Sequence, residues 1–235
     1  MAALKRLVLL VEGKGDIVAA PALIGKLLNE LQASDPAVFL DTKPLRVGGI
    51  TGLFGKKEKN WTDNLLVAAK RGSLGGVLLL LDGDVEAWRG QRFCARDVGR
   101  DLSRRARAAG AGSVFSVASV FACQEFESWL IAGIESLAGK KLANGRIEIP
   151  GNLKLPEGDL EQHPRDAKGW LNECIPGGYN PVTDQEHLTR AVNYNVIRQR
   201  NLRSFRRLES ALRQLVEAVR SGKHIVTPAE PTVGS

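Results

Sequence analysis

Short apolar runs alternate along this chain with longer stretches in which apolar residues recur every three or four positions. The runs are typical of buried strands, and the longer stretches of helices that pack by one face. The first run, residues 6–11, predicts a strand, and a helix is expected from Asp16 or Pro21 to Gln32. Residues 42–47 predict a second strand, which leads into a loop rich in glycine and lysine.

The middle of the chain continues this alternation. A helix is predicted over 60–71, and the consecutive leucines of GGVLLLLDGD predict a central strand buried on both faces. Residues 86–109 are predicted to be mostly helical, 113–121 form another β-rich run, and 123–137 are predicted to be helical. Strands that alternate with helices imply an α/β fold with a mostly parallel central sheet flanked by helices.

The pattern changes after Gly139. A stretch crowded with glycine, proline and asparagine predicts a long loop up to Pro164, and only helices are predicted beyond it, near 166–174, 184–193 and 204–221. Apolar residues of the last helix recur at helical spacing, so one side packs on the body of the protein. The predicted organisation is an α/β domain over 1–138, a loop insertion with a helical C-terminal extension over 139–224, and a flexible tail over 225–235.

Composition narrows the class of protein. Hydrophobic residues make up 43% of the 235 positions, which is enough for a buried core. The first apolar run is too short to span a membrane and leads into charged residues, so neither a membrane protein nor a signal peptide is expected. The scattered cysteines Cys94, Cys123 and Cys174 favour free thiols in the cytoplasm over a zinc site or a disulfide framework.

The turn after the first strand, in VEGKGD, contains two glycines and therefore invites comparison with phosphate-binding loops. A dinucleotide fingerprint needs a third glycine, and Val18 stands at that position. The later GLFGKK is no P-loop, because Ile50 replaces its first glycine and Lys57 its serine or threonine. Glu12 ends the first strand, where it would repel phosphate, so a metal site is the better hypothesis.

A second set of acids supports the metal hypothesis. Asp82 and Asp84 end the leucine-rich strand, and residues two apart in a strand point to the same side. The carboxyl ends of parallel strands share one edge of the sheet, so these acids and Glu12 are expected to converge there. Close carboxylates repel one another unless a hard cation such as Mg²⁺ or Mn²⁺ lies among them. Asp-Gly is also a common turn, and Asp16 can simply cap the following helix.

These motifs resemble the TOPRIM fold, which topoisomerases, DnaG-type primases and OLD-family nucleases share. LVLLVEG is similar to its Glu-Gly motif and LLLLDGD to its Asp-x-Asp motif, and VEGKGD is similar to the nuclease-type variant in which Asp16 joins the metal site. ACQEFESWLIAG and LRSFRRLESAL resemble a bacterial TOPRIM-related family classed as a domain of unknown function. The resemblance implies a Rossmann-like TOPRIM domain followed by the helical extension.

Within that resemblance, the functions separate by what the chain lacks. A topoisomerase needs a catalytic tyrosine on an additional domain, and the chain has only Tyr179 and Tyr194 and no room for that domain. The cysteines exclude the zinc module of a primase. The resemblance therefore implies a metal-dependent nuclease in phage defence or DNA repair, with a partner ATPase by analogy.

Glu125 and Glu127 follow the fourth predicted strand at the same sheet edge. They are candidates for a second metal or for orienting water. An ordinary helix start gives the same pattern, because acids there complement the helix dipole. Both interpretations stay open.

The net charge of +7 favours polyanionic partners, nucleic acid above all. The segment VIRQRNLRSFRR is predicted to contact nucleic acid through Arg198, Arg200, Arg203, Arg206 and Arg207. Phosphate groups would also suit a second stripe, which consists of Arg92, Arg96, Arg100 and Arg104. A solvated helix face gives the same pattern.

The predicted function is a Mg²⁺- or Mn²⁺-dependent phosphodiester hydrolase acting on nucleic acid. Asp82 and Asp84, with Asp16, would hold metal, and Glu12 would be a ligand or the general base. The alternative is a non-catalytic module that binds nucleic acid or nucleotide and retains the acids of the fold.

Overall fold

The computed structural model describes residues 4–33, 35–55, 60–85, 87–143 and 145–229. Its centre is a parallel sheet in the order β2-β1-β4-β7-β8, and β3 pairs with the other half of the β1 edge that β2 occupies. The strands are β1 (Lys5–Val11), β2 (Val38–Leu40), β3 (Leu45–Arg46), β4 (Leu74–Asp82), β7 (Ser116–Ala122) and β8 (Val226–Thr227). The predicted α/β class is confirmed.

Helices cover both faces of the sheet because its strands bury alternate residues on opposite sides. One apolar cluster joins Leu7, Leu9 and Leu80 to α1 (Asp16–Leu31) and α9 (Arg203–Ser221). The other joins Val8 and Leu10 to the opposite helices. These helices are α2 (Ile50–Phe54), α3 (Trp61–Ala69) and α4 (Ala95–Arg107).

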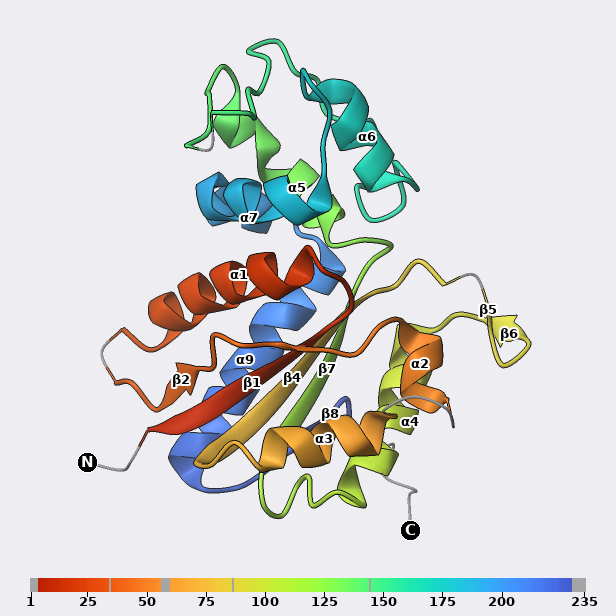
Figure 1. Cartoon of the computed structure of the whole chain (residues 1–235), viewed down its shortest axis with the longest axis vertical. Helices are drawn as coiled ribbons and strands as arrows, with labels where there is room; N and C mark the ends of the chain where they lie inside the picture. Colours follow the sequence, from red (N-terminus) through yellow and green to blue (C-terminus); the bar gives the residue numbers. More distant parts are fainter. Residues whose placement is uncertain (1–3, 34, 56–59, 86, 144, 230–235) are drawn as a thin grey trace.

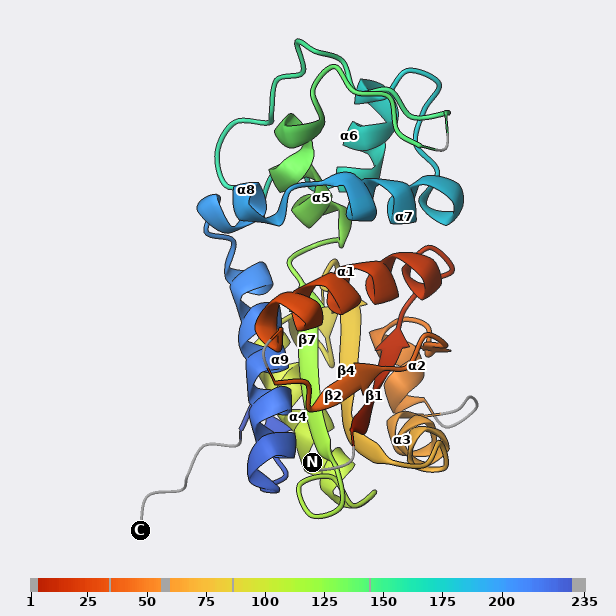
Figure 2. The same cartoon turned by 90° about the vertical axis from the view of Figure 1, so that its left-hand side faces the viewer.

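A group of helices lies beyond the carboxyl ends of the strands (Figures 1 and 2). It contains α5 (Glu127–Gly133), the 3-10 helix η1 (Ile134–Leu137), α6 (Ala167–Cys174), α7 (Pro181–Ala191) and α8 (Tyr194–Gln199). Asn180, Asn193 and Asp166 cap α7, α8 and α6 with side-chain oxygens, as polar residues at such positions usually do. This group closes over the sheet edge where the acids were predicted.

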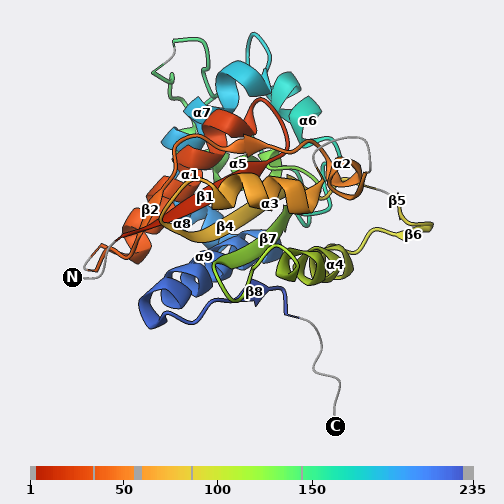
Figure 3. The same ribbon diagram turned by 60° about the horizontal axis from the view of Figure 1, so that its bottom comes forward.

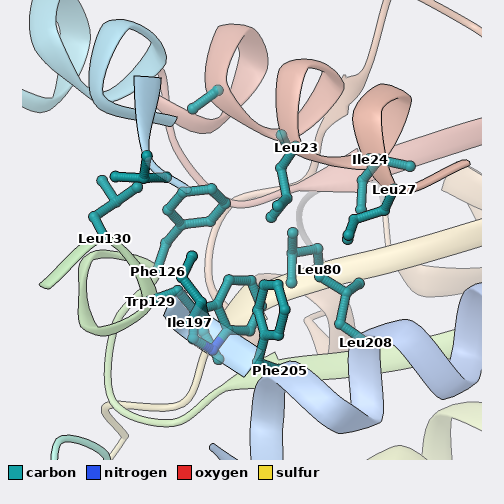
Figure 4. Packing of buried hydrophobic residues seen from close by; sticks show 14 of the residues in the cluster. Leu23, Ile24, Leu27, Leu80, Phe126, Trp129, Leu130, Ile197, Phe205 and Leu208 are labelled. Carbon is teal, nitrogen blue, oxygen red and sulfur yellow. The ribbon is translucent and has the colours of Figure 1, made fainter. Parts of the chain in front are cut away.

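Aromatic packing fixes the helical group to the sheet. Phe126 and Trp129 pack with Phe205 of α9 in the core that Figure 4 shows, and the Trp129 indole N–H donates to the Ser204 hydroxyl at 2.8 Å. Trp129 is 1% exposed. Because α9 lies against the sheet and also holds α5, the predicted extension shares its core with the α/β domain.

The prediction of a helix over 86–109 is wrong for residues 87–94, and residue 86 lies outside the described residues. Ala87–Trp88 (β5) and Gln91–Arg92 (β6) pair as an antiparallel hairpin that projects from the body (Figure 3). Its two central residues, Arg89 and Gly90, have φ of 50° and 76°, the conformation of a tight hairpin turn. The helix α4 therefore begins only at Ala95.

Residues 225–229 also differ from the predicted tail, whose remaining part, 230–235, lies outside the described residues. Val226 and Thr227 form β8 beside β7 and are 6% and 8% exposed. The amide of Val117 donates to the Ile225 carbonyl at 2.8 Å, which continues the pairing. The sheet thus ends with a strand from the end of the sequence.

Candidate metal centre

The acids predicted to converge come from three adjacent strands of the sheet. Glu12 follows β1, Asp82 is the last residue of β4, and Glu125 lies three residues beyond the end of β7. Asp82 is level with Ala122 in the β4–β7 pairing, so these strands end together. Parallel pairing alone therefore brings the three residues to one edge.

Glu12 lies directly against the end of β4. Its Oε2 accepts a hydrogen bond from the Asp82 amide at 3.2 Å. The other oxygen of Glu12, Oε1, faces Gly49. A Cβ atom on residue 49 would lie only 3.3 Å from this oxygen. Burial raises the pKa of Glu12, and the nearby Asp84 and Asp16 carboxylates raise it further against the effect of the Asp82 amide.

Asp16 orders the glycine turn and holds α7. Its Oδ2 accepts from the Gly13 amide at 2.8 Å, and its Oδ1 accepts from the Gln185 side-chain amide at 3.1 Å. Helix α1 has no side-chain cap, so the alternative in which Asp16 caps the helix is not observed. Both oxygens are engaged in keeping the turn and α7 together.

Asp82 and Asp84 have different surroundings. The Asp82 Oδ1 accepts from the Phe126 amide at 2.8 Å, and burial raises the pKa of this carboxyl well above its ordinary value. Asp84 is exposed, because β4 ends at Asp82 and the alternation of a strand does not continue to it. The predicted pair is thus divided between the interior and the surface.

Glu125 and Glu127 are both buried at this edge, at 8% and 0% exposure. The Tyr179 hydroxyl donates to Glu127 Oε1 at 2.9 Å, whereas Oε2 has no hydrogen-bond partner within the described residues. Burial raises the pKa of Glu127 to about 7. An ordinary helix start does not account for a fully buried carboxylate with an oxygen that accepts no hydrogen bond from the described residues.

A strained turn positions Glu125. Gln124 has a φ of 64°, which is uncommon for a residue other than glycine. Its carbonyl accepts from the Gly83 amide at 2.8 Å, and its side-chain amide donates to the Gln162 carbonyl at 3.0 Å. These two bonds hold the turn, and Glu125 follows it into the site.

Lys168 of α6 contacts the acids that lie on either side of it. Its Nζ lies 3.2 Å from Asp82 Oδ2, 2.6 Å from Glu125 Oε1 and 3.5 Å from Glu127 Oε2. Burial alone would lower the pKa of this lysine, but Glu127, Asp82 and Glu125 outweigh it and the net shift is upward. The lysine was not among the predicted site residues, because nothing in the local pattern of DAKGWLNEC distinguishes it.

The carboxylates around Lys168 fit a divalent cation. Asp82, Glu125 and Glu127 each offer an oxygen within 4.8 Å of the others. Two oxygens on one Mg²⁺ or Ca²⁺ can be about 4–5 Å apart, since the metal–oxygen distances are about 2.0–2.6 Å. The Oε2 of Glu127 is buried and accepts no hydrogen bond from the described residues, so it is available to such a cation once Lys168 moves away. We call these three acids with Lys168 the carboxylate–lysine cluster.

The arginines predicted to contact nucleic acid separate into three groups. Arg198 pairs with Glu30 and Glu209 at 2.6 and 2.7 Å, and Arg200 pairs with Glu135, so these two arginines hold the fold together. Arg206 is exposed. Arg203 and Arg207 line a groove of about 1100 Å³ beside the sheet edge, which the other arginines of the segment do not.

The fold and its carboxyl edge define an α/β protein with an acidic cluster between the sheet and a helical group. The chain belongs to the family described as Domain of unknown function (DUF4276), whose profile matches residues 11–213. No curated protein and no solved structure matches the chain. Among the described residues, no helix is both long and apolar enough to cross a membrane.

Proposed function

We propose that this protein is a Mg²⁺- or Mn²⁺-dependent phosphodiester hydrolase that acts on nucleic acid. The observation that carries the proposal is the convergence of Asp82, Glu125 and Glu127, which each offer an oxygen within 4.8 Å of the others, while the buried Oε2 of Glu127 accepts no hydrogen bond from the described residues. The resemblance of the Glu12 and Asp82 motifs to the TOPRIM nucleases supports the same reaction. The unpaired thiols Cys94, Cys123 and Cys174 favour a cytoplasmic enzyme.

In this proposal the metal ligands are Asp82, Glu125 and Glu127. A bound metal would lower the pKa of a water molecule and neutralise charge on the phosphate. Glu12 lies beside Asp82, where it can accept a proton from a bound water molecule, and burial raises its pKa, which makes it a stronger base than an ordinary carboxylate. Asp84 is exposed at the mouth of the site, where it can orient the substrate or hold a second cation. Asp16 keeps the turn in place.

Lys168 takes the place of the cation in the metal-free protein. An ammonium and a divalent ion repel each other at such distances, so metal binding requires the lysine to move. Its side chain is 36% exposed, which leaves a path to solvent. Once displaced, the ammonium would lie beside the metal and bind a phosphate oxygen of the substrate.

The same lysine favours one alternative function. If Lys168 permanently neutralises the acids, no metal is needed, and the protein is a non-catalytic module that binds nucleic acid. The two functions differ in one measurable property, which is whether Mn²⁺ or Mg²⁺ binds to the carboxylate–lysine cluster.

A thermal-shift and nuclease experiment tests the proposal. Mn²⁺ is expected to raise the melting temperature of the wild type. At a hundredfold excess of Mn²⁺ over its Kd, the free energy of unfolding should increase by about 2.7 kcal/mol. Asp82→Asn with Glu127→Gln should abolish this gain, because both amides still accept the hydrogen bonds from Phe126 and Tyr179 but neutralise no cation. Glu157→Gln, at an exposed acid, is the matched control.

The same samples are then assayed on end-labelled single-stranded DNA, duplex DNA and RNA. Glu12→Gln should lower cleavage by at least about a hundredfold, the scale of general-base catalysis. A wild type that neither responds to metal nor cleaves any of these substrates would contradict the hydrolase and favour the binding module. By the TOPRIM analogy, a partner ATPase in phage defence or DNA repair is also proposed, so the assay is repeated with an ATPase encoded beside the gene.

A further inference from the structure

A large groove lies next to the carboxylate–lysine cluster and has a different chemistry. Its volume is about 1100 Å³. The ends of β4 and β7, the segment from β6 into α4, the loop before α6 and the start of α9 all contribute to its walls. Gly83, Asp84 and Gln124 belong to its lining, so the groove begins one or two residues from Asp82 and Glu125.

The groove carries a concentration of unpaired positive charge. Five arginines line it, from three separate segments of the chain: Arg92, Arg96, Arg165, Arg203 and Arg207. None of them forms an ion pair with another residue of the described ranges, whereas Arg100, Arg104 and Arg105 on the remainder of α4 pair with Asp97 or Asp101. Arginines gathered in this way repel one another, and a polyanion would remove that repulsion.

Among the described residues, the acids that line the groove do not balance these arginines. Glu161 is 5% exposed, and its two oxygens accept from the Arg203 and Ser204 amides at 2.9 and 2.6 Å. Its charge is thus directed at the start of α9. Asp84 lies at the end of the groove that adjoins the metal centre.

Two of the arginines occupy positions that do not favour helix stability. Arg96 lies in the first turn of α4, and Arg203 is the first residue of α9. A positive charge at the start of a helix is disfavoured by the helix dipole. Their placement is explained if they contact anions in the groove, where both helices begin.

An aromatic ring adds a second kind of contact. Phe93 lines the groove and is half-buried, and its ring packs edge-on against Phe121 with 5.7 Å between the centroids. Binding sites for single-stranded nucleic acid combine a positively charged groove that follows the phosphate backbone with aromatic rings on which the bases stack. The volume is slightly above the range of about 300–1000 Å³ typical of small-ligand pockets, which suits a few nucleotides of one strand and not a duplex.

We propose that this arginine groove binds single-stranded nucleic acid and leads its phosphate backbone past Asp84 to the metal centre. The binding stands on the groove alone, and the delivery to the centre rests on the proposed hydrolase function. For Arg92 and Arg96 the sequence left both phosphate contact and a solvated helix face open. In this proposal they belong to the same nucleic-acid surface as Arg203 and Arg207.

Fluorescence anisotropy with a short end-labelled oligo(dT) in EDTA tests the binding without any metal. Arg96→Gln/Arg165→Gln/Arg203→Gln should weaken binding at least tenfold. It should also lower the salt slope by about two units, because each phosphate that is no longer neutralised reduces the slope by roughly 0.7. The corresponding triple lysine variant should keep the slope. Phe93→Ala should weaken binding about tenfold with the slope unchanged, because stacking releases no counterions.

The control removes the same charge elsewhere on the surface, with Lys70→Gln/Arg213→Gln/Lys223→Gln at three exposed positions outside the groove. The control should bind like the wild type. Equal losses in both triple variants, or no loss in the groove variant, would overturn the proposal, as would competition by a blunt duplex as strong as by the single strand. Melting temperatures of all variants establish that the fold is retained.

The two proposals fail in different ways. If oligo(dT) binds through the groove but neither metal binding nor cleavage occurs, the hydrolase proposal fails and the binding proposal stands. If metal-dependent cleavage occurs with full affinity in the groove variant, the groove proposal fails and the hydrolase proposal stands.

Discussion

At the scale of single residues, the centre of this protein depends on one lysine among three acids. Glu127 is buried, Asp82 is half-buried, and both have raised pKa values, so each would resist ionisation without a nearby positive charge. Lys168 supplies that charge from α6, and its own amide also donates to Glu125 Oε2 at 3.1 Å. The lysine therefore joins the helical group to the ends of the strands.

Lys168→Met should destabilise the metal-free protein and strengthen metal binding. Removing one partner of a buried ion pair costs about 3–5 kcal/mol, and because Lys168 is 36% exposed we expect about 2 kcal/mol. Mn²⁺ should then restore stability, since it no longer competes with the ammonium. Urea unfolding in EDTA and in Mn²⁺ measures both effects.

Lys154→Met, at an exposed lysine, is the control for this change. A Lys168→Met protein that is as stable as the wild type in EDTA would show that the lysine does not hold the acids together. If it is destabilised but Mn²⁺ gives no recovery, the lysine is a permanent structural cation.

At the scale of elements, a cluster at the other end of the sheet links three segments. Arg6 of β1 and Arg71, which follows α3, each lie 3.0 Å from Asp41 Oδ2, and the Lys43 amide donates to Oδ1 at 3.0 Å. Burial alone would raise the pKa of Asp41, but these three partners outweigh it and the net shift is downward. The edge strands β2 and β3 are short, and Asp41 fixes the connection between them.

Asp41→Asn should lower the free energy of unfolding by about 1–2 kcal/mol at neutral pH. Because the folded-state pKa of Asp41 lies below its ordinary value of 3.8, its stabilisation is fully present above that value and is lost as pH falls through the folded-state pKa. The difference between wild type and variant should therefore shrink in acid. Urea unfolding over about pH 3 to 7 measures it, and a difference independent of pH would contradict the assigned ion pairs.

At the scale of the whole molecule, the chain returns to its starting sheet before it ends. Helix α9 packs on the face of the sheet that α1 also covers, and β8 then pairs with β7. The Ser103 hydroxyl of α4 donates to the Pro228 carbonyl at 2.9 Å, and the Arg207 guanidinium donates to the Thr227 hydroxyl at 3.0 Å. The end of the sequence thus closes the sheet and supports one wall of the arginine groove.

Truncation after Lys223 should destabilise the protein by about 3 kcal/mol, the sum expected for exposing Val226 and losing the β8 hydrogen bonds. Truncation after Ala229, which retains β8, is the control and should leave stability unchanged. Thermal unfolding of both proteins checks the prediction. Equal melting temperatures would mean that β8 adds nothing to the fold.

Much of the fold follows from local pattern. The runs Leu7–Val11 and Leu78–Leu81 are apolar at every position, and only a strand buried on both faces accommodates such a run. The parallel arrangement that this alternation implies is enough to place Glu12 and Asp82 at one edge. The sequence also predicted the buried face of α9, because Phe205, Leu208 and Leu212 recur at helical spacing, and all three are buried.

The local sequence pattern does not predict the hairpin over 87–92. The strands β5 and β6 are two residues long, too short for alternation to appear, and the arginines that follow them continue at helical spacing. The positive φ of Arg89, a residue that seldom adopts it, decides the turn. The local pattern does not predict the positive φ of Arg89, because tertiary packing imposes this conformation.

The sequence by itself determined the buried strands, their alternation with helices and the acids that end β1 and β4. Only the tertiary structure decided which charges meet. It paired Arg198 and Arg200 with glutamates, brought Lys168 across a long loop to Glu127, and gathered the unpaired arginines of distant segments into one groove. The physical reason is that periodicity records which side of an element is buried, whereas the partner of a charge depends on the packing of elements far apart in the chain.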